Sequence, residues 1–146
     1  QIRSPADAAN LLMGEMGLLE QEQMRTILLD TKNRVLAIPT IYVGSVNTTL
    51  IRIAEVFREA IRRNCPSIIV VHNHPSGDPS PSMEDKLITL MIMASAHLFD
   101  VQVLDHIIVD MDSDAYRSFA DEKIIEDTKQ KVMAIMDQIP NTLAKP

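Results

Sequence analysis

Aromatic side chains are scarce in this sequence of 146 residues: they make up 3% of the chain, and tryptophan is absent. Proteins that bind single-stranded nucleic acids commonly stack the bases on aromatic rings, so this scarcity argues against that class. The formal net charge of −6 argues in the same direction, because phosphate contacts require a surplus of Lys and Arg. The core must be aliphatic, built from Ile, Leu, Val and nine Met residues.

The sequence contains one cysteine, Cys65, so no disulfide can form within the chain. Cys65 precedes an apolar segment, which favours a packed thiol over a nucleophile. No apolar run approaches the ~18 residues of a membrane span, and no signal peptide is recognisable. We therefore expect a cytoplasmic protein without a membrane segment. The length predicts a single domain over residues 1–146.

Segments of helix and strand character alternate along the chain. Apolar spacing predicts helices over residues 4–17, 53–63, 83–98 and 120–138, the last ended by Pro140. Strands are predicted over residues 23–29, 34–43, 67–71, 101–104 and 106–109, with a break at Pro39 and with Asp105 between the last two. The first two strands form a hairpin, and prolines make 72–81 a loop. This order predicts an α/β (α+β mixed) fold, a central mixed sheet flanked by helices.

Three residues near the end of the buried strand have the side chains of a metal site. If the strand continues through His72 and His74, both imidazoles leave it on the same side. Asp85 falls in the first turn of the next helix, and the Pro-rich loop can bring that turn over the strand end. Two imidazoles and one carboxylate, with water in an open fourth position, are a common catalytic zinc set. We therefore predict Zn²⁺ as the cofactor.

Other interpretations of these residues remain open. A His-x-His pair in a loop is often unrelated to metal binding. Ser82-x-x-Asp85 is also a capping box for the helix that follows, a structural role that can coexist with a functional one. His106 is more simply a structural histidine than a fourth metal ligand, and it could also support a metal ligand. His97, late in a helix, is most simply a partner of the helix dipole.

The complete spacing of His72, His74, Ser82 and Asp85 resembles the signature of JAMM (MPN-plus) metalloproteases. The stretch Val-His-Asn-His-Pro-Ser-Gly-Asp-Pro-Ser-Pro-Ser resembles the RadC branch of that family, as do residues 29–34 and 104–108. The resemblance covers residues 4–120 and leaves the helix over 120–138 unmatched. RadC proteins usually carry a helix-hairpin-helix segment upstream, which this chain lacks, and a His-Pro-Arg element that is lost here.

The resemblance implies a three-layer JAMM/MPN fold, similar to that of cytidine deaminases, and a hydrolase of peptide or isopeptide bonds. His72, His74 and Asp85 would bind zinc, and Ser82 would stabilise the oxyanion. Glu22 matches the position of the family's general base; by spacing alone its rivals are Glu20, Glu55 and Glu84.

Two other classes stay open: a DNA-associated accessory module and a metal-free scaffold. The acidic charge disfavours nucleic-acid binding by this chain, and the retained ligand set disfavours the scaffold. The substrate would be a peptide or protein. A homo-oligomer is conceivable through the apolar residues of the last helix, namely Met133, Ile135, Met136 and Ile139.

Overall fold

A computed structural model describes residues 1–110 and 115–139 of the chain. The elements in this part are α1 (Pro5–Met16), β1 (Gln23–Leu29), β2 (Val35–Ala37), β3 (Thr40–Val43), α2 (Ile53–Arg62), β4 (Ser67–His74), α3 (Met83–Phe99), β5 (Gln102–Asp110), β6 (Tyr116–Ser118) and α4 (Ile124–Asp137). Among the described residues, no helix combines the length and the apolar character needed to cross a membrane.

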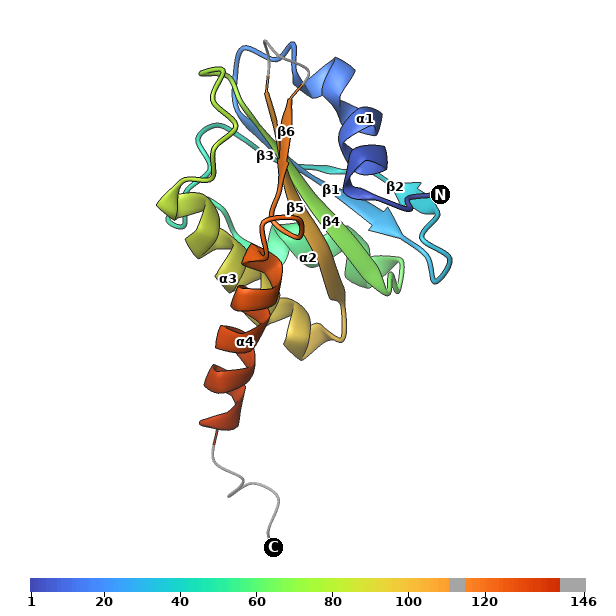
Figure 1. The fold of residues 1–146 in the computed structure, drawn as a ribbon. Helices are drawn as coiled ribbons and strands as arrows, with labels where there is room; N and C mark the ends of the chain where they lie inside the picture. The colour runs from blue at the N-terminus through green and yellow to red at the C-terminus, as the bar shows by residue number, and fades with distance from the viewer. Residues whose placement is uncertain (111–114, 140–146) are drawn as a thin grey trace, which may run out of the picture.

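A mixed sheet of six strands lies at the centre of the described part (Figure 1). Its order is β2-β1-β4-β5-β6, and β3 also pairs with β1. β4 and β5 run parallel, with α3 as the crossover between them, whereas β1 is antiparallel to β4 and to both β2 and β3. Every residue of β4 except its last is buried, which explains its unbroken apolar run. The predicted α/β fold class and the hairpin are confirmed.

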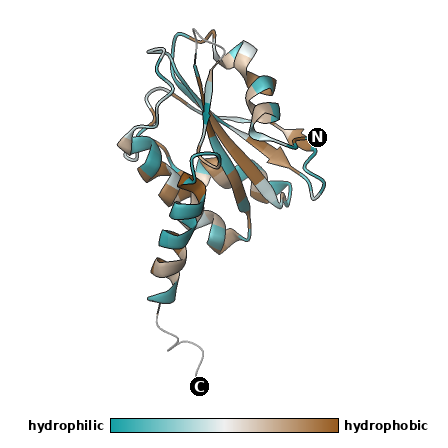
Figure 2. Ribbon diagram, viewed as in Figure 1, coloured by the Kyte–Doolittle hydropathy of each residue, from teal (hydrophilic) through white to brown (hydrophobic). Residues whose placement is uncertain are grey.

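Helices cover both faces of the sheet, giving three layers (Figure 1). α1 packs on one face together with alternate strand residues such as Ile69 and Val71. On the other face, α2, α3 and α4 pack with the strand residues of opposite parity, including Ile68 and Val70. Figure 2 shows that the most hydrophobic segments are the central strands, between these two layers. The alternation of side chains in a strand therefore decides which layer each residue of β4 meets.

Two boundaries differ clearly from the sequence prediction, and one strand was missed. β4 continues to His74, so the expected loop starts after the two histidines rather than at His72. Pairing with β5 holds all three additional residues in the strand, and His72 also pairs with Met24 of β1. α4 begins at Ile124 rather than 120, since residues 119–123 form turns, and its predicted stop, Pro140, lies outside the described residues. The sequence prediction also missed β6, a short strand at the edge of the sheet.

The two strands expected around Asp105 are one strand, β5, with an irregularity at that point. Val103 pairs with Ile68, but Asp105 pairs with the next residue, Ile69, so that Leu104 is an additional residue in the ladder. Such a bulge reverses the alternation of side chains beyond it. As a result His106 lies on the face that α3 covers, where it contacts Thr89 of that helix.

Candidate metal centre

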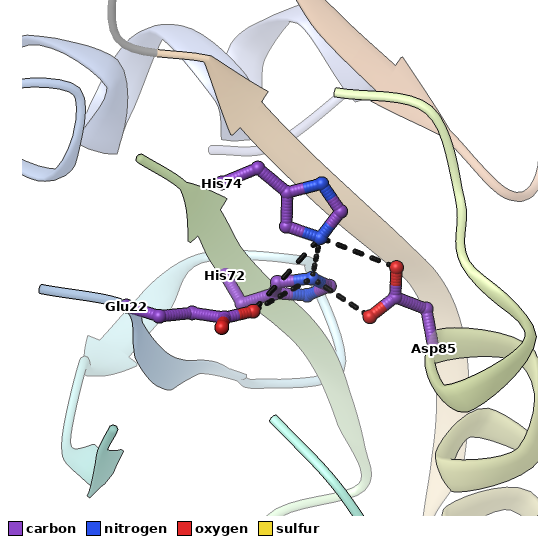
Figure 3. Close-up of side chains that lie close together, drawn as sticks. All are labelled: Glu22, His72, His74 and Asp85. Carbon is purple, nitrogen blue, oxygen red and sulfur yellow. Dashed lines mark hydrogen bonds and ion pairs between the residues drawn. The ribbon is translucent and has the colours of Figure 1, made fainter. Parts of the chain in front are cut away.

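The two predicted histidines occupy the carboxyl end of β4, with residue 73 between them. Being two residues apart, they extend from the same side of the strand, as expected. Their Nε2 atoms are 2.8 Å apart, and the His72 side chain is fully buried while that of His74 is 13% exposed. Figure 3 shows both rings turned toward a common point in front of α3.

Asp85 reaches this point from the first turn of α3. Its Oδ1 lies 3.1 Å from His72 Nε2, and its Oδ2 lies 3.2 Å from His74 Nε2. The predicted capping box is also present: Oδ2 accepts from the Ser82 N–H at 2.7 Å, and the Ser82 hydroxyl accepts from the Asp85 N–H at 3.1 Å. The two interpretations of this motif are therefore compatible, because each oxygen of the buried carboxylate has room for more than one partner.

Glu22 completes the group from the opposite side, directly before β1 (Figure 3). Its Oε1 lies 3.9 Å from the Nε2 atoms of both histidines, farther than either oxygen of Asp85. The ligand atoms of all four residues lie within 4.8 Å of one another. Of the alternatives, Glu20 and Glu55 are exposed and outside this group, and the Glu84 carboxylate accepts from the Thr48 N–H.

Asn73 is a residue beside the candidate site that sequence reasoning missed. It lies between the two histidines and therefore points to the other face of the sheet. There its side-chain oxygen accepts from the Gln23 N–H at 2.7 Å, and its amide nitrogen donates to the Gln21 carbonyl at 3.2 Å. These bonds hold the backbone on both sides of Glu22. The sequence signal for Asn73 was the His-Asn-His triplet itself. Only strand pairing shows which groups the Asn73 side chain contacts.

The chemistry of this group fits a divalent metal such as zinc. His74 Nδ1 faces the Asp78 carbonyl at 2.9 Å, which can only accept, so Nδ1 carries the proton and Nε2 presents a lone pair. That lone pair faces the Nε2 of His72, and at 2.8 Å the two nitrogens either share a proton or face a cation between them. Ligand atoms around a tetrahedral zinc are roughly 3.3 Å apart, given bond lengths of ~2.0 Å. The His–His and His–Asp separations approach this value, whereas Glu22 lies beyond it.

The charges of the site are strongly coupled. Burial alone would raise the pKa of Asp85, but hydrogen bonds with His72 and His74 outweigh it and hold that pKa far below its usual range. Burial lowers the pKa of His74, yet its hydrogen bonds with Asp85 and with the Asp78 carbonyl reverse this, so the pKa is raised overall. Without a metal the site therefore favours an anionic Asp85 beside a protonated imidazole, and a metal ion can replace that proton.

Ser82 lies at the exposed side of the centre, at the N-cap of α3. It lines a pocket of about 470 Å³ together with Glu22, His74, Asp85 and residues of the Pro-rich loop. A larger groove of about 650 Å³ between α3, α4 and the start of β5 contains none of the four clustered residues. Of these two, the pocket at Ser82 is thus the one that opens onto the candidate metal centre.

His106 is fully buried beside the centre, and its Nε2 lies 2.6 Å from His72 Nδ1. Burial, together with the nearby His72, holds the pKa of His106 well below its ordinary value. This contact agrees with a residue that supports a candidate metal ligand, and His106 is not one of the four clustered residues. His97 lies in the last turn of α3, as predicted, outside the cluster of four.

The fold and the cluster define a class: a three-layer α/β domain with a candidate site for one metal ion at the end of its central strand. A family model described as RadC-like JAB domain matches residues 2–124, so the chain belongs to that family. The expected resemblance is thereby confirmed.

Similar curated proteins include several that are called UPF0758 proteins. Those of Chloroflexus aurantiacus and Roseiflexus castenholzii are 59% and 60% identical over 108 and 109 residues, which cover 74% and 75% of this chain and 47% of each relative. That of Moorella thermoacetica is 48% identical over 108 residues, covering 74% of this chain and 47% of its own. The matched part is about half the length of these relatives.

Proposed function

We propose that this domain is a zinc-dependent hydrolase of amide bonds, acting on a peptide or isopeptide. The observation that carries the proposal is the arrangement of His72, His74 and Asp85 at ligand spacing, with Glu22 farther away at 3.9 Å. A bound zinc ion would polarise the scissile carbonyl and lower the pKa of a water molecule. Three ligands and one more distant carboxylate match such a site better than four equal ligands do.

In this proposal Glu22 is the general base and then the proton donor. A carboxylate beside the ligands can accept a proton from the attacking water and then donate it to the leaving amine, so that the C–N bond breaks with a neutral product. The Glu22 side chain is 21% exposed, compared with 2% for Asp85, so it can reach both the centre and the pocket. Asn73 would keep it in register through the backbone of Gln21 and Gln23.

Ser82 is the proposed donor to the oxyanion. Its oxygen accepts from the Asp85 N–H, which leaves the hydroxyl hydrogen available for a substrate oxygen. The position at the N-terminus of α3 adds the favourable helix dipole to this role. A donor aimed at charge that develops in the transition state contributes about 10²–10³-fold to the rate.

The charge around the pocket favours a peptide over a nucleic acid as substrate. Four carboxylates line the pocket, belonging to Glu22, Asp78, Glu84 and Asp85, and no Lys or Arg is among the described residues that line it. A phosphodiester backbone would be repelled at this entrance. A neutral or basic peptide segment would meet no such barrier.

The first experiment measures metal and hydrolysis together. The purified protein, stripped with chelator and reloaded with Zn²⁺, should bind one equivalent, and His74→Ala should not. The loaded protein is then tested on a set of peptides and lysine-linked isopeptides, with the stripped protein as control. Absence of zinc binding would refute the metal centre. Zinc binding without cleavage of any amide would refute the hydrolase and leave the metal site.

A further inference from the structure

A chain of short hydrogen bonds connects two of the candidate ligands through residues outside the ligand cluster. The Thr89 hydroxyl lies 2.6 Å from the Asp85 carbonyl, one turn earlier in α3. The same hydroxyl lies 2.6 Å from His106 Nδ1, and His106 Nε2 lies 2.6 Å from His72 Nδ1. Thr89, His106 and His72 are all buried. The proposed hydrolysis, as described so far, uses neither Thr89 nor His106.

The order of protons along this chain follows from the chemistry of its first group. A backbone carbonyl can only accept, so the Thr89 hydroxyl must donate to the Asp85 carbonyl. A hydroxyl has one hydrogen, so toward His106 it can only accept. His106 Nδ1 therefore carries a proton and donates it to Thr89.

The same reasoning passes through the His106 ring to His72. His106 is fully buried, which disfavours an imidazole with both nitrogens protonated. Its Nε2 is then an acceptor, and among the described residues the donor that faces it, at 2.6 Å, is the Nδ1–H of His72. With the proton on Nδ1, the Nε2 of His72 presents its lone pair toward His74 and Asp85.

We propose that Thr89 and His106 are positioning residues that fix the tautomer of His72, so that its Nε2 lone pair faces the metal. This inference rests on the metal centre of the proposed function. The two histidine ligands are oriented differently: His74 donates directly to a backbone carbonyl, that of Asp78, while His72 reaches a backbone carbonyl through two side chains.

Two features hold in place the chain of hydrogen bonds from Asp85 through Thr89 and His106 to His72, which we call the relay. Phe119 packs on the His106 ring with a centroid separation of 4.5 Å. The bulge at Leu104 places His106 on the face of the sheet that α3 covers. The relay begins at the backbone carbonyl of Asp85, which is itself a candidate ligand. It therefore connects one candidate ligand, Asp85, with another, His72. A change at Thr89 should therefore alter the centre without removing any ligand.

The test compares Thr89→Val with Thr89→Ser. Valine has the same shape as threonine but no hydroxyl, whereas serine keeps the hydroxyl. The tautomer of His72 is read from ¹⁵N chemical shifts of the imidazoles in chelator-treated protein, and zinc affinity is read by competition with a chromophoric chelator. We expect wild type and Thr89→Ser to carry the His72 proton on Nδ1. In Thr89→Val we expect part of the population to move to Nε2–H, with zinc affinity reduced ~10–100-fold.

A second pair keeps the inference testable if Thr89→Val does not fold. His106→Gln retains an acceptor for His72, and His106→Leu removes it, so His106→Leu should lose the Nδ1–H tautomer and the affinity while His106→Gln keeps more of both. An unchanged His72 tautomer and zinc affinity in folded Thr89→Val or His106→Leu would overturn the relay. If the wild type binds no zinc, the proposed function fails instead, and the tautomers of the metal-free protein still decide the relay.

Discussion

The chain contains two capping boxes of the same form, Ser4-x-x-Asp7 at α1 and Ser82-x-x-Asp85 at α3. In both, the Ser hydroxyl accepts from the Asp N–H and the Asp carboxylate accepts from the Ser N–H. Only the surroundings differ. Asp7 is exposed and its nearest additional partner is the Arg3 N–H, whereas Asp85 is buried against two imidazoles.

The local motif therefore supplies a helix start, and the strand opposite Asp85 supplies the chemistry. The pKa of each carboxyl is lowered, but for different reasons. For Asp7 the main cause is the hydrogen bond from the Arg3 backbone, a local contact. For Asp85 burial opposes the shift, and the two histidines of β4 overcome it. A carboxylate held anionic inside the protein is suited to a cation, while one held anionic at the surface is only a cap.

The largest expected difference between the two boxes is in metal binding. Asp85→Asn should reduce zinc affinity by more than about 100-fold, because it removes a charged ligand rather than a supporting group. Asp7→Asn should leave the affinity unchanged. Calorimetric titration of the stripped proteins with Zn²⁺ measures both. Equal affinities for the two variants would show that the Asp85 box is only a cap.

The next largest effect is expected at Glu22, the carboxylate that lies beside the Asp85 capping box and not beside the Asp7 box. Glu22→Gln should retain zinc and slow hydrolysis by about 10²–10⁴-fold, since an amide cannot transfer the proton. The matched control is Glu20→Gln, because Glu20 is exposed two residues earlier in the chain and outside the cluster. Rates are compared under single-turnover conditions with any amide that the wild type cleaves. A similar loss in both variants would contradict the assignment of the base.

Substitution of the two N-cap serines distinguishes a structural role from a catalytic one. Ser4→Ala and Ser82→Ala should each cost about 1 kcal/mol of stability, because each removes the same N-cap hydrogen bond. Only Ser82→Ala should also reduce kcat, by about 10²-fold, as expected for loss of an oxyanion donor. Urea unfolding and steady-state kinetics measure the two effects. If kcat is the same in both variants, Ser82 is a cap without a catalytic role.

The smallest expected effect is in the pH dependence of stability. Because the pKa of His74 is raised in the folded state, its stabilisation of the metal-free protein is complete below the unfolded pKa of about 6.5 and is lost as pH rises through the folded value. The gap in Tm between wild type and His74→Ala, measured with chelator, should therefore be larger at pH 6 than at pH 8. With zinc the trend should reverse, because protons compete for the ligands. Asp7→Asn should show neither trend.

Much of the fold follows from patterns that are local in the sequence. The buried apolar run before His72 and the break at Pro39 identify strands correctly, because burial on both faces and loss of a backbone donor act on consecutive residues. The break expected at Asp105 was wrong in kind. A bulge and a strand end disturb the alternation in the same way, and only pairing with β4 distinguishes them.

Some features of the candidate site could likewise be predicted from the sequence, and others could not. Spacing alone could relate His72 to His74, because two residues on one strand share a side. It could not choose Glu22 over Glu20, since that choice depends on how β1 pairs with β4 and on the hold of Asn73 on its backbone. Nor could it connect Thr89 with His106, which are 17 residues apart and meet only through the crossover from α3 to β5.

The kinds of side chain available for a metal, the helix capped by Ser82 and most of the order of strands and helices follow from the sequence alone. These depend on residue types and on contacts between near neighbours in the chain. Which of the two capping boxes faces the histidines, and which carboxylate lies beside them, follows only from the tertiary structure. Those outcomes depend on sheet pairing and burial, which join residues that are distant in sequence and set their charge and hydrogen bonding.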